Sequence, residues 1–307
     1  MRVPLSVLET ASRHFPGSSL AVAGCAASRI RSRYCEIDLL AYPASGQPKL
    51  IERKDVLYRV VPLKSRAQLY LGEMQVARDE SWSLSSLSAG RDEKKVARLR
   101  RAASLRRQDA AASFAAEAFA ARRKEDLAAS TLNMLSAVAR AAEAALLASG
   151  EPIHPSHMVA RLRERGELPP LAAIASFDLP STSNCQRRIG ALESALPPLE
   201  ARIAVRKLRG ALGEGRPFDM LFYSYWLMAG MLEKGQHLAV PLGAHLRIAL
   251  DQSELDRKLE ETASLLRRVM AAGGRYKMKI NVNDGHGSTR PRPGRSPGPE
   301  RGRAPSN

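Results

Sequence analysis

The stretch Ala21–Tyr42, AVAGCAASRIRSRYCEIDLLAY, sets the expectation for the rest of the chain. An apolar run ends at Gly24 and Cys25, and after a ten-residue spacer Glu36 and Asp38 lead into a second apolar run. Because alternate residues of a β-strand point to the same face, the two carboxylates are expected to lie side by side. Two like charges that close are costly unless a cation lies between them, and Mg²⁺ prefers oxygen ligands. The stretch therefore predicts two strands joined by a turn, with a metal-binding pair of carboxylates on the second strand.

The segment between the two apolar runs offers an anion site near these carboxylates. Gly24 is expected to form a turn that opens a short helix over 26–33, whose free backbone N–H groups would face a phosphate. Arg29, Arg31 and Arg33 would either contact a triphosphate or nucleic acid, or form the solvated face of that helix. A phosphate site that faces paired carboxylates is the minimal equipment for metal-dependent nucleotidyl transfer.

The composition of the whole chain is that of a soluble globular protein with an excess of basic residues. With 307 residues, of which 44% are hydrophobic and 26% charged, the chain is long enough for two domains. Its formal net charge of +17 attracts polyanions, so nucleic acid or a nucleoside triphosphate is the expected class of partner. The most apolar run, 218–232, contains Asp219 and is too short to span a membrane, so it predicts a buried helix. No signal-peptide pattern is found at the N-terminus, and a cytoplasmic location without a membrane partner is expected.

The cysteines and histidines give no sign of a metal site in the sequence. The three cysteines, Cys25, Cys35 and Cys185, are odd in number and lack the spacing of zinc ligands. This pattern predicts neither a disulfide-stabilised fold nor a structural metal site. His154 and His157 lie beside prolines with no acidic partner at ligand spacing, so a surface or structural role is expected for both.

Hydrophobic periodicity and turn residues predict an α+β protein. A small mixed β-sheet domain over 1–90 is expected to precede a larger all-helical domain over 91–280 and a disordered basic tail over 281–307. In the first domain the expected elements are a helix over 5–14, strands over 18–23 and 36–42, a third strand or a hairpin over 49–63, and a Ser-rich connection over 81–90. The absence of Pro and Gly between Arg91 and Gly150 predicts two or three long helices. Shorter helices are expected over 156–165, 188–196, 199–212, 218–232 and 253–272.

The opening stretch resembles the nucleotidyltransferase fold of the DNA polymerase beta superfamily, and most of all its small prokaryotic minimal nucleotidyltransferases. Members of that family carry an apolar residue, Gly-Gly or Gly-Ser, a short spacer and an acidic–apolar–acidic triplet. The corresponding positions here are Ala23, Gly24-Cys25, a ten-residue spacer and Glu36-Ile37-Asp38. The resemblance covers residues 5–80. In the family a helical extension usually shapes the acceptor pocket, and the resemblance implies that residues 91–275 would play that part here.

The resemblance implies a chemistry and a role for each matching residue. Glu36 and Asp38 would hold Mg²⁺, or Mn²⁺ in its place, and would be catalytic. Gly24, Cys25 and Arg29 would bind the phosphates of the NTP substrate. A nucleoside monophosphate would pass from the NTP to a hydroxyl or amine on an unknown acceptor.

Several positions depart from the family pattern. The family carries a third carboxylate on a later strand, and the candidates for it, as metal ligand or base, are Asp55 and secondarily Glu52. Arg59, in the middle of VLYRVV, occupies about the place where an aspartate is expected. Cys25 and Glu36 replace the family's usual Ser or Gly and Asp. Intact catalysis and a fold that has lost its catalysis both remain open.

Three functions from different classes therefore compete. The leading hypothesis is a nucleotidyltransferase, and the alternative is a catalytically degenerate module that binds nucleic acid or a partner protein through basic helices. The run KKVARLRRAASLRR, 94–107, would bind phosphates in that alternative, or its basic residues would simply solvate an amphipathic helix. The third hypothesis is an all-helical scaffold with an incidental β-hairpin. The aromatic residues within 218–226 would stack a base in a binding role, or would belong to the core.

Overall fold

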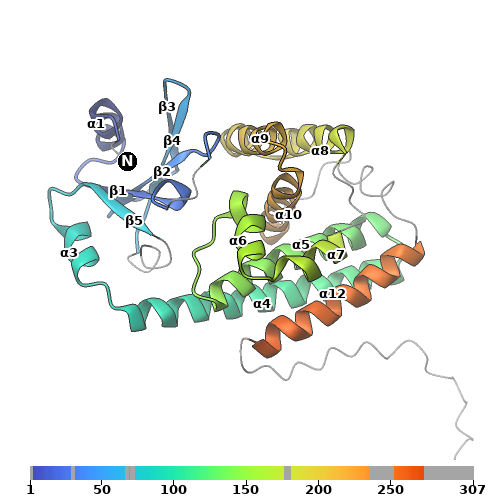
Figure 1. The fold of residues 1–307 in the computed structure, drawn as a ribbon. Coiled ribbons are helices and arrows are strands. Elements are labelled where there is room, and N and C mark those ends of the chain that lie inside the picture. The colour runs from blue at the N-terminus through green and yellow to red at the C-terminus, as the bar shows by residue number, and fades with distance from the viewer. Residues whose placement is uncertain are drawn as a thin grey trace, which may run out of the picture. The chain divides into compact units, whose positions relative to one another are not determined.

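The computed structural model describes residues 3–28, 32–65, 69, 73–175, 181–235 and 252–272. In this part of the chain a five-stranded mixed sheet is followed by a series of helices, which confirms the predicted α+β class (Figure 1). Residues 1–274 form one compact unit. The predicted disordered tail over 281–307 lies outside the described residues, as do Arg29 and Arg31.

The sheet has the strand order β3-β4-β2-β1-β5. The strands are β1 (Ser19–Ala23), β2 (Ile37–Tyr42), β3 (Lys49–Arg53), β4 (Val56–Pro62) and β5 (Met74–Arg78). β2 pairs antiparallel with β1 and parallel with β4, and in the second pairing Asp38 is the register partner of Arg59. The hairpin alternative for 49–63 is confirmed as β3 and β4, which turn at Lys54 and Asp55. Because the sheet is mixed and five-stranded, an all-helical scaffold with an incidental hairpin is excluded.

The two faces of the sheet have different partners. α1 (Leu5–His14) packs Val7, Leu8 and Ala11 against one face. That face is built from Leu20, Val22, Ile37, Leu39, Ala41, Tyr58 and Val60. Since side chains alternate along a strand, the residues between these point to the opposite face. Asp38 of β2 and Arg59 of β4 are therefore on the side of the sheet that α1 leaves free.

The helical part begins with two long helices joined by a short connection. In chain order the α-helices after α1 are α3 (Ser83–Ala89), α4 (Glu93–Arg123), α5 (Leu127–Ala148), α6 (Met158–Glu164), α7 (Leu168–Ala175), α8 (Thr182–Ala195), α9 (Pro198–Gly213), α10 (Pro217–Glu233) and α12 (Gln252–Ala272), with short 3₁₀ turns η1 (Gly24–Ala26) and η2 (Pro155–His157). Asp92 and Asp126 cap α4 and α5, because their carboxylates accept hydrogen bonds from the backbone N–H groups of Lys94 and Ala129. None of the described helices combines the length and apolar character needed to cross a membrane.

Three local expectations need correction. Of the helix expected over 26–33, only Ala26 lies in a helical turn, the 3₁₀ turn η1, and the described residues 27–28 and 32–33 are not helical. The Ser-rich connection over 81–90 contains α3, which buries Leu84 and Leu87 against the sheet. α7 was not expected because it starts with Leu-Pro-Pro, although proline is tolerated in the first turn of a helix, where its missing N–H has no intrahelical partner.

The connection between β1 and β2 joins the sheet to the helices. Cys25, Tyr34 and Cys35 from this connection belong to the same buried cluster as the core of α4, α5 and α10. The ring of Tyr34 lies directly on Gly210 of α9, where a Cβ atom would come within 2.4 Å of the ring Cγ. Only glycine allows this approach, so the residues that lead into β2 are positioned by α9 as well as by the sheet.

Candidate functional site

The predicted carboxylate pair lies at the start of β2, next to the turn at Gly24. Gly24 has φ +66°, and a Cβ atom built on it would lie 2.8 Å from Oδ2 of Asp38. A side chain at this position would collide with the carboxylate, and the positive φ also favours glycine. The structure thus brings Gly24, Glu36 and Asp38 together, in the arrangement that the sequence predicted.

Two cations hold the two carboxylates. Arg59 places Nε 2.7 Å from Oδ1 of Asp38 and Nη2 3.5 Å from Oε1 of Glu36. Lys207 of α9 donates from Nζ to the same Oε1 of Glu36 at 2.8 Å. Glu36 is buried, with 3% of its surface exposed, so its ion pair with Lys207 is shielded from water, whereas Arg59 and Asp38 are partly exposed. We refer to Glu36, Asp38, Arg59 and Lys207 as the carboxylate cluster.

The charges of the cluster shift one another's pKa values. Burial raises the pKa of Glu36, but the positive charges of Lys207 and Arg59 outweigh it, and the pKa falls below its ordinary value. Burial raises the pKa of Asp38 above its ordinary value despite Arg59, and the nearby charge of Glu36 acts in the same direction. Burial disfavours the charged form of Lys207, but Tyr223, whose ring centroid lies 5.3 Å from Nζ, and Glu36 raise its pKa. Lys207 therefore stays protonated, and Glu36 keeps its negative charge.

A cavity of about 320 Å³ lies beside the carboxylate cluster. Its wall includes Gly24, Cys25, the cluster itself and Glu143 of α5. The buried carboxylate of Glu143 is also satisfied by cations and a ring N–H. Its partners are Arg140 at 2.7 Å, Arg107 at 3.1 Å and Nε1 of Trp226 at 2.8 Å. The cavity is thus lined by charges of both signs, most of them already paired.

Lys207 and Glu143 were not predicted from the sequence. One signal for Lys207 was present, because it lies on the apolar stripe of α9 formed by Ala204, Leu208 and Ala211. A lysine on such a stripe is buried only if a carboxylate meets it, but the sequence does not say which one.

Asp55, the predicted third carboxylate, does not join the cluster. It lies in the β3–β4 turn, four residues before Arg59, which corresponds to about 13 Å along an extended strand. Its carbonyl oxygen accepts a hydrogen bond from Arg206. Glu52, the second choice, forms an ion pair with Arg202 on the surface. The position across from Asp38 on the parallel strand is held by Arg59.

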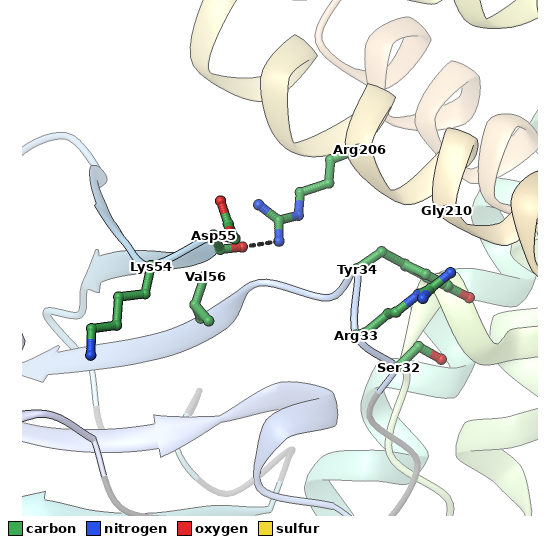
Figure 2. A pocket seen from close by; sticks show the side chains of 8 residues that line it. All are labelled: Ser32, Arg33, Tyr34, Lys54, Asp55, Val56, Arg206 and Gly210. Atoms are coloured by element: carbon green, nitrogen blue, oxygen red, sulfur yellow. Dashed lines mark hydrogen bonds between the residues drawn. The ribbon is translucent and has the colours of Figure 1, made fainter.

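Asp55 instead lines a separate cavity of about 630 Å³, shown in Figure 2. The figure shows Arg206 reaching across from α9 to the Asp55 carbonyl, with Tyr34 and Arg33 on the other side of the opening. Arg33, for which a phosphate contact and a solvated surface position were the two alternatives, is largely exposed and lies 3.4 Å from Glu214. Arg29 lies outside the described residues.

The carboxylate cluster is a poor fit for Mg²⁺. A magnesium site needs anionic or neutral oxygen donors, and here Oδ1 of Asp38 already binds Arg59 and Oε1 of Glu36 already binds Lys207. A divalent cation placed between the carboxylates would face two positive charges at close range. Oε2 of Glu36 remains as a possible donor, because it is buried and has no hydrogen-bond partner in the described structure.

Cys25 packs against a second thiol. Both Cys25 and Cys35 are buried, and Sγ of Cys35 lies 3.0 Å from Nε2 of His157. The hydrogen bond with Cys25, together with His157 and against the effect of burial, lowers the pKa of Cys35 to about 4. The structure therefore shows His157 buried beside a thiol, and His154 is buried as well, so the predicted surface alternative for the two histidines is wrong.

The basic run on α4 divides into paired and unpaired residues. Lys94, Arg98 and Arg101 are exposed, and none of these three side chains contacts a carboxylate of the described chain. Arg100 is half-buried and donates to the carbonyl of Gly150, whereas Arg107 is bound to Glu143. We refer to Lys94, Arg98 and Arg101 as the α4 stripe.

Comparisons with models of protein families, with curated proteins and with solved structures gave no match to this chain. The resemblance to the nucleotidyltransferase superfamily therefore stays a hypothesis that rests on the glycine turn and on the spacing of Glu36 and Asp38.

Proposed function

We propose that this protein is a nucleotidyltransferase-like module that binds nucleic acid through the α4 stripe and keeps its carboxylate pair in ion pairs. The observation that carries the proposal is Arg59, whose guanidinium binds both carboxylates from the strand position opposite Asp38. In the family that the sequence resembles, a third carboxylate on a later strand completes the metal site. A guanidinium at that place supplies the neutralising charge that the metal would otherwise supply.

The energetics favour keeping the ion pairs over exchanging them for a metal ion. Glu36 is buried, and breaking a buried pair by taking away one partner costs about 3–5 kcal/mol because the other charge stays uncompensated. Lys207 is itself nearly buried, with 10% of its side chain exposed, so it cannot simply turn into solvent. We infer that the cluster fastens the sheet to α9 and does not turn over a substrate.

The α4 stripe is the surface that suits a phosphate backbone. Its members are spaced i, i+4 and i+7, so they lie within about 60° of one another around the helix. They extend over about 10 Å at the helical rise of 1.5 Å per residue. A stripe of this length can contact successive phosphates of one strand, and release of the counterions from those phosphates drives the binding. Since no carboxylate of the described chain neutralises Lys94, Arg98 or Arg101, their full charge is available to a polyanion.

The direct test is binding of a fluorescently labelled single-stranded RNA, and a DNA of the same sequence, followed by anisotropy. Replacing the three stripe residues by Gln is expected to weaken binding by about tenfold or more at low salt. The matched control is a second triple replacement by Gln, of Arg202, Arg209 and Arg257. These three are also exposed arginines on helices, but each already has a carboxylate partner. Equal losses in the two triple variants would contradict a specific role for the stripe.

Nucleotidyl transfer remains the second candidate, and one observation favours it. Oε2 of Glu36 is a buried acceptor without a partner, and it belongs to a residue that lines the 320 Å³ cavity. The test is incubation with Mg²⁺ or Mn²⁺ and each labelled NTP, with pyrophosphate release as the measurement and Asp38→Ala as the control. Release by the wild type that is absent from Asp38→Ala would establish this candidate over a degenerate module.

A further inference from the structure

The β1–β2 connection and the turn η2 bring together three soft metal ligands that are remote in sequence. Cys25 lies in η1, Cys35 lies just before β2, and His157 ends η2. We infer that Cys25, Cys35 and His157 form a binding site for a thiophilic divalent metal ion, for which Zn²⁺ is the natural probe. This site is separate from the α4 stripe and from the carboxylate cluster.

The geometry of the three side chains suits a tetrahedral ion. The two Sγ atoms and a ring nitrogen of His157 all lie within 4.8 Å of one another. Sγ of Cys35 is 3.0 Å from Nε2 of His157. Bond lengths of about 2.3 Å to sulfur and 2.0–2.1 Å to nitrogen place such ligand atoms about 3.5 Å apart at tetrahedral angles. The observed pair needs to open by about half an ångström, which is a small side-chain adjustment.

The chemistry and burial of the three ligands favour zinc over magnesium or calcium. Thiolate and imidazole are the ligands that zinc prefers, whereas magnesium and calcium take oxygen donors. Cys25, Cys35 and His157 are 8%, 1% and 2% exposed, so a bound ion would be shielded from solvent and from competing ligands. In the described part of the chain no fourth Cys, His, Asp or Glu belongs to this group. Three protein ligands leave the fourth position of a tetrahedral ion to a water molecule, which could enter from the 320 Å³ cavity that Cys25 also lines.

An ion at this site would join the sheet to the helical part. Cys25 and Cys35 flank the connection that leads into the carboxylate cluster, while His157 lies in the turn before α6. Cys25 and Ser156 also line the 320 Å³ cavity, so the site borders the carboxylate cluster. Because an ion that binds only the folded chain stabilises it, zinc is expected to raise the melting temperature.

The experiment measures metal content in the full chain, purified with a reducing agent that does not bind metals. Wild type, Cys35→Ser and His157→Gln are stripped with EDTA, reloaded with Zn²⁺ and freed of excess ion. Cys185→Ser is the matched control, because Cys185 is the remaining cysteine, equally buried, and outside the group. Wild type and Cys185→Ser are expected to retain about one zinc ion per chain, and the other two variants much less than half of that. Co²⁺ in place of Zn²⁺ should give wild type a thiolate-to-metal charge-transfer band that Cys35→Ser loses.

Two results would overturn the inference, and the first does not depend on any variant. Reduced wild-type protein that retains no Zn²⁺, and whose melting temperature does not change when Zn²⁺ is added, does not contain the site. If wild-type protein that binds no zinc forms a Cys25–Cys35 disulfide on oxidation, the two cysteines are a redox pair and not metal ligands. Zinc retained equally by wild type, Cys35→Ser and His157→Gln would show that the ion binds elsewhere.

Discussion

The carboxylate cluster and the α4 stripe use the same kinds of cation in opposite ways. In the cluster, Arg59 and Lys207 each bind a carboxylate at 2.7–2.8 Å, and the site is largely buried. On the stripe, Lys94, Arg98 and Arg101 are exposed and meet no carboxylate of the described chain. A cation that is already paired inside the protein has little left to offer an incoming anion, whereas an unpaired one on the surface attracts it. The cations of the α4 stripe are therefore free to meet a partner of the protein, while the charges around Glu36 and Asp38 are balanced internally.

Removing the buried cation of the cluster should have the largest effect on stability. Lys207→Met leaves Glu36 buried without its closest partner, so the free energy of unfolding should fall by about 3–5 kcal/mol in a urea titration. The matched control is Lys234→Met, whose ion pair with Glu200 is exposed and should be worth less than about 1 kcal/mol. Adding Glu36→Gln to Lys207→Met should recover part of the loss, because the orphaned charge is then gone. Equal losses in the two single variants would mean that the cluster is not an internally balanced site.

Acid should affect the cavity beside the cluster but not the stripe. His154 is 5% exposed, and burial together with the nearby His157 lowers its pKa to about 4 from its ordinary value of 6.5. In the unfolded chain His154 is protonated as the pH falls below about 6.5, whereas in the folded chain it is protonated only near pH 4. The folded state is therefore destabilised relative to the unfolded state as the pH falls through this window. Between pH 7 and pH 5 the loss should be about 1–2 kcal/mol.

Unfolding titrations of wild type and His154→Gln at the two pH values measure this effect. The variant should lose less stability over the interval, whereas the variant with a neutral α4 stripe should lose as much as wild type, since lysine and arginine do not titrate there. A wild-type stability that is level between pH 7 and pH 5 would contradict the assignment of His154 as a buried neutral side chain.

A smaller effect on stability tests whether Arg59 excludes a metal ion from the cluster. If its guanidinium is what separates the cluster from a metal site, Arg59→Asp should create a third carboxylate and an affinity for Mg²⁺. At ten times its Kd the ion should then stabilise the variant by about 1.4 kcal/mol, measured as the change in stability between EDTA and Mg²⁺. Arg59→Asn, which removes the cation without adding a carboxylate, is the control. A wild type that is stabilised by Mg²⁺ as much as Arg59→Asp would show that Arg59 does not exclude the metal.

The sequence was informative where local pattern decides structure. The apolar runs on both sides of the Gly24 turn predicted β1 and β2, and strand periodicity correctly placed Glu36 and Asp38 on one face. β5 was not predicted, because this strand at the edge of the sheet has no fully buried residue and its short sequence MQVAR has only weak alternation. Edge strands depend on their neighbour more than on their own pattern.

What the sequence could not supply are contacts between residues far apart in the chain. Lys207 reaches Glu36 across 171 positions, and His157 reaches Cys35 across 122. Spacing rules for metal ligands apply to residues that are close together in one sequence motif. They therefore did not identify Cys25 and Cys35 as metal ligands, and they cannot find a histidine that the fold brings in from a distant turn. Asp55 shows the converse, since a residue close in sequence to β4 is carried away from Asp38 by the hairpin turn.

The salt dependence of nucleic-acid binding is the most direct test of the proposal that the α4 stripe, and not the carboxylate cluster, contacts the phosphates. The logarithm of the association constant is plotted against the logarithm of the salt concentration for wild type, Asp38→Asn and the triple Gln variant of the α4 stripe. Equal slopes are expected for wild type and Asp38→Asn, and a slope smaller by about 2–3 for the stripe variant, since each lost phosphate contact removes about 0.7–0.9. An unchanged slope in the stripe variant, or a loss of binding in Asp38→Asn, would contradict binding through the α4 stripe.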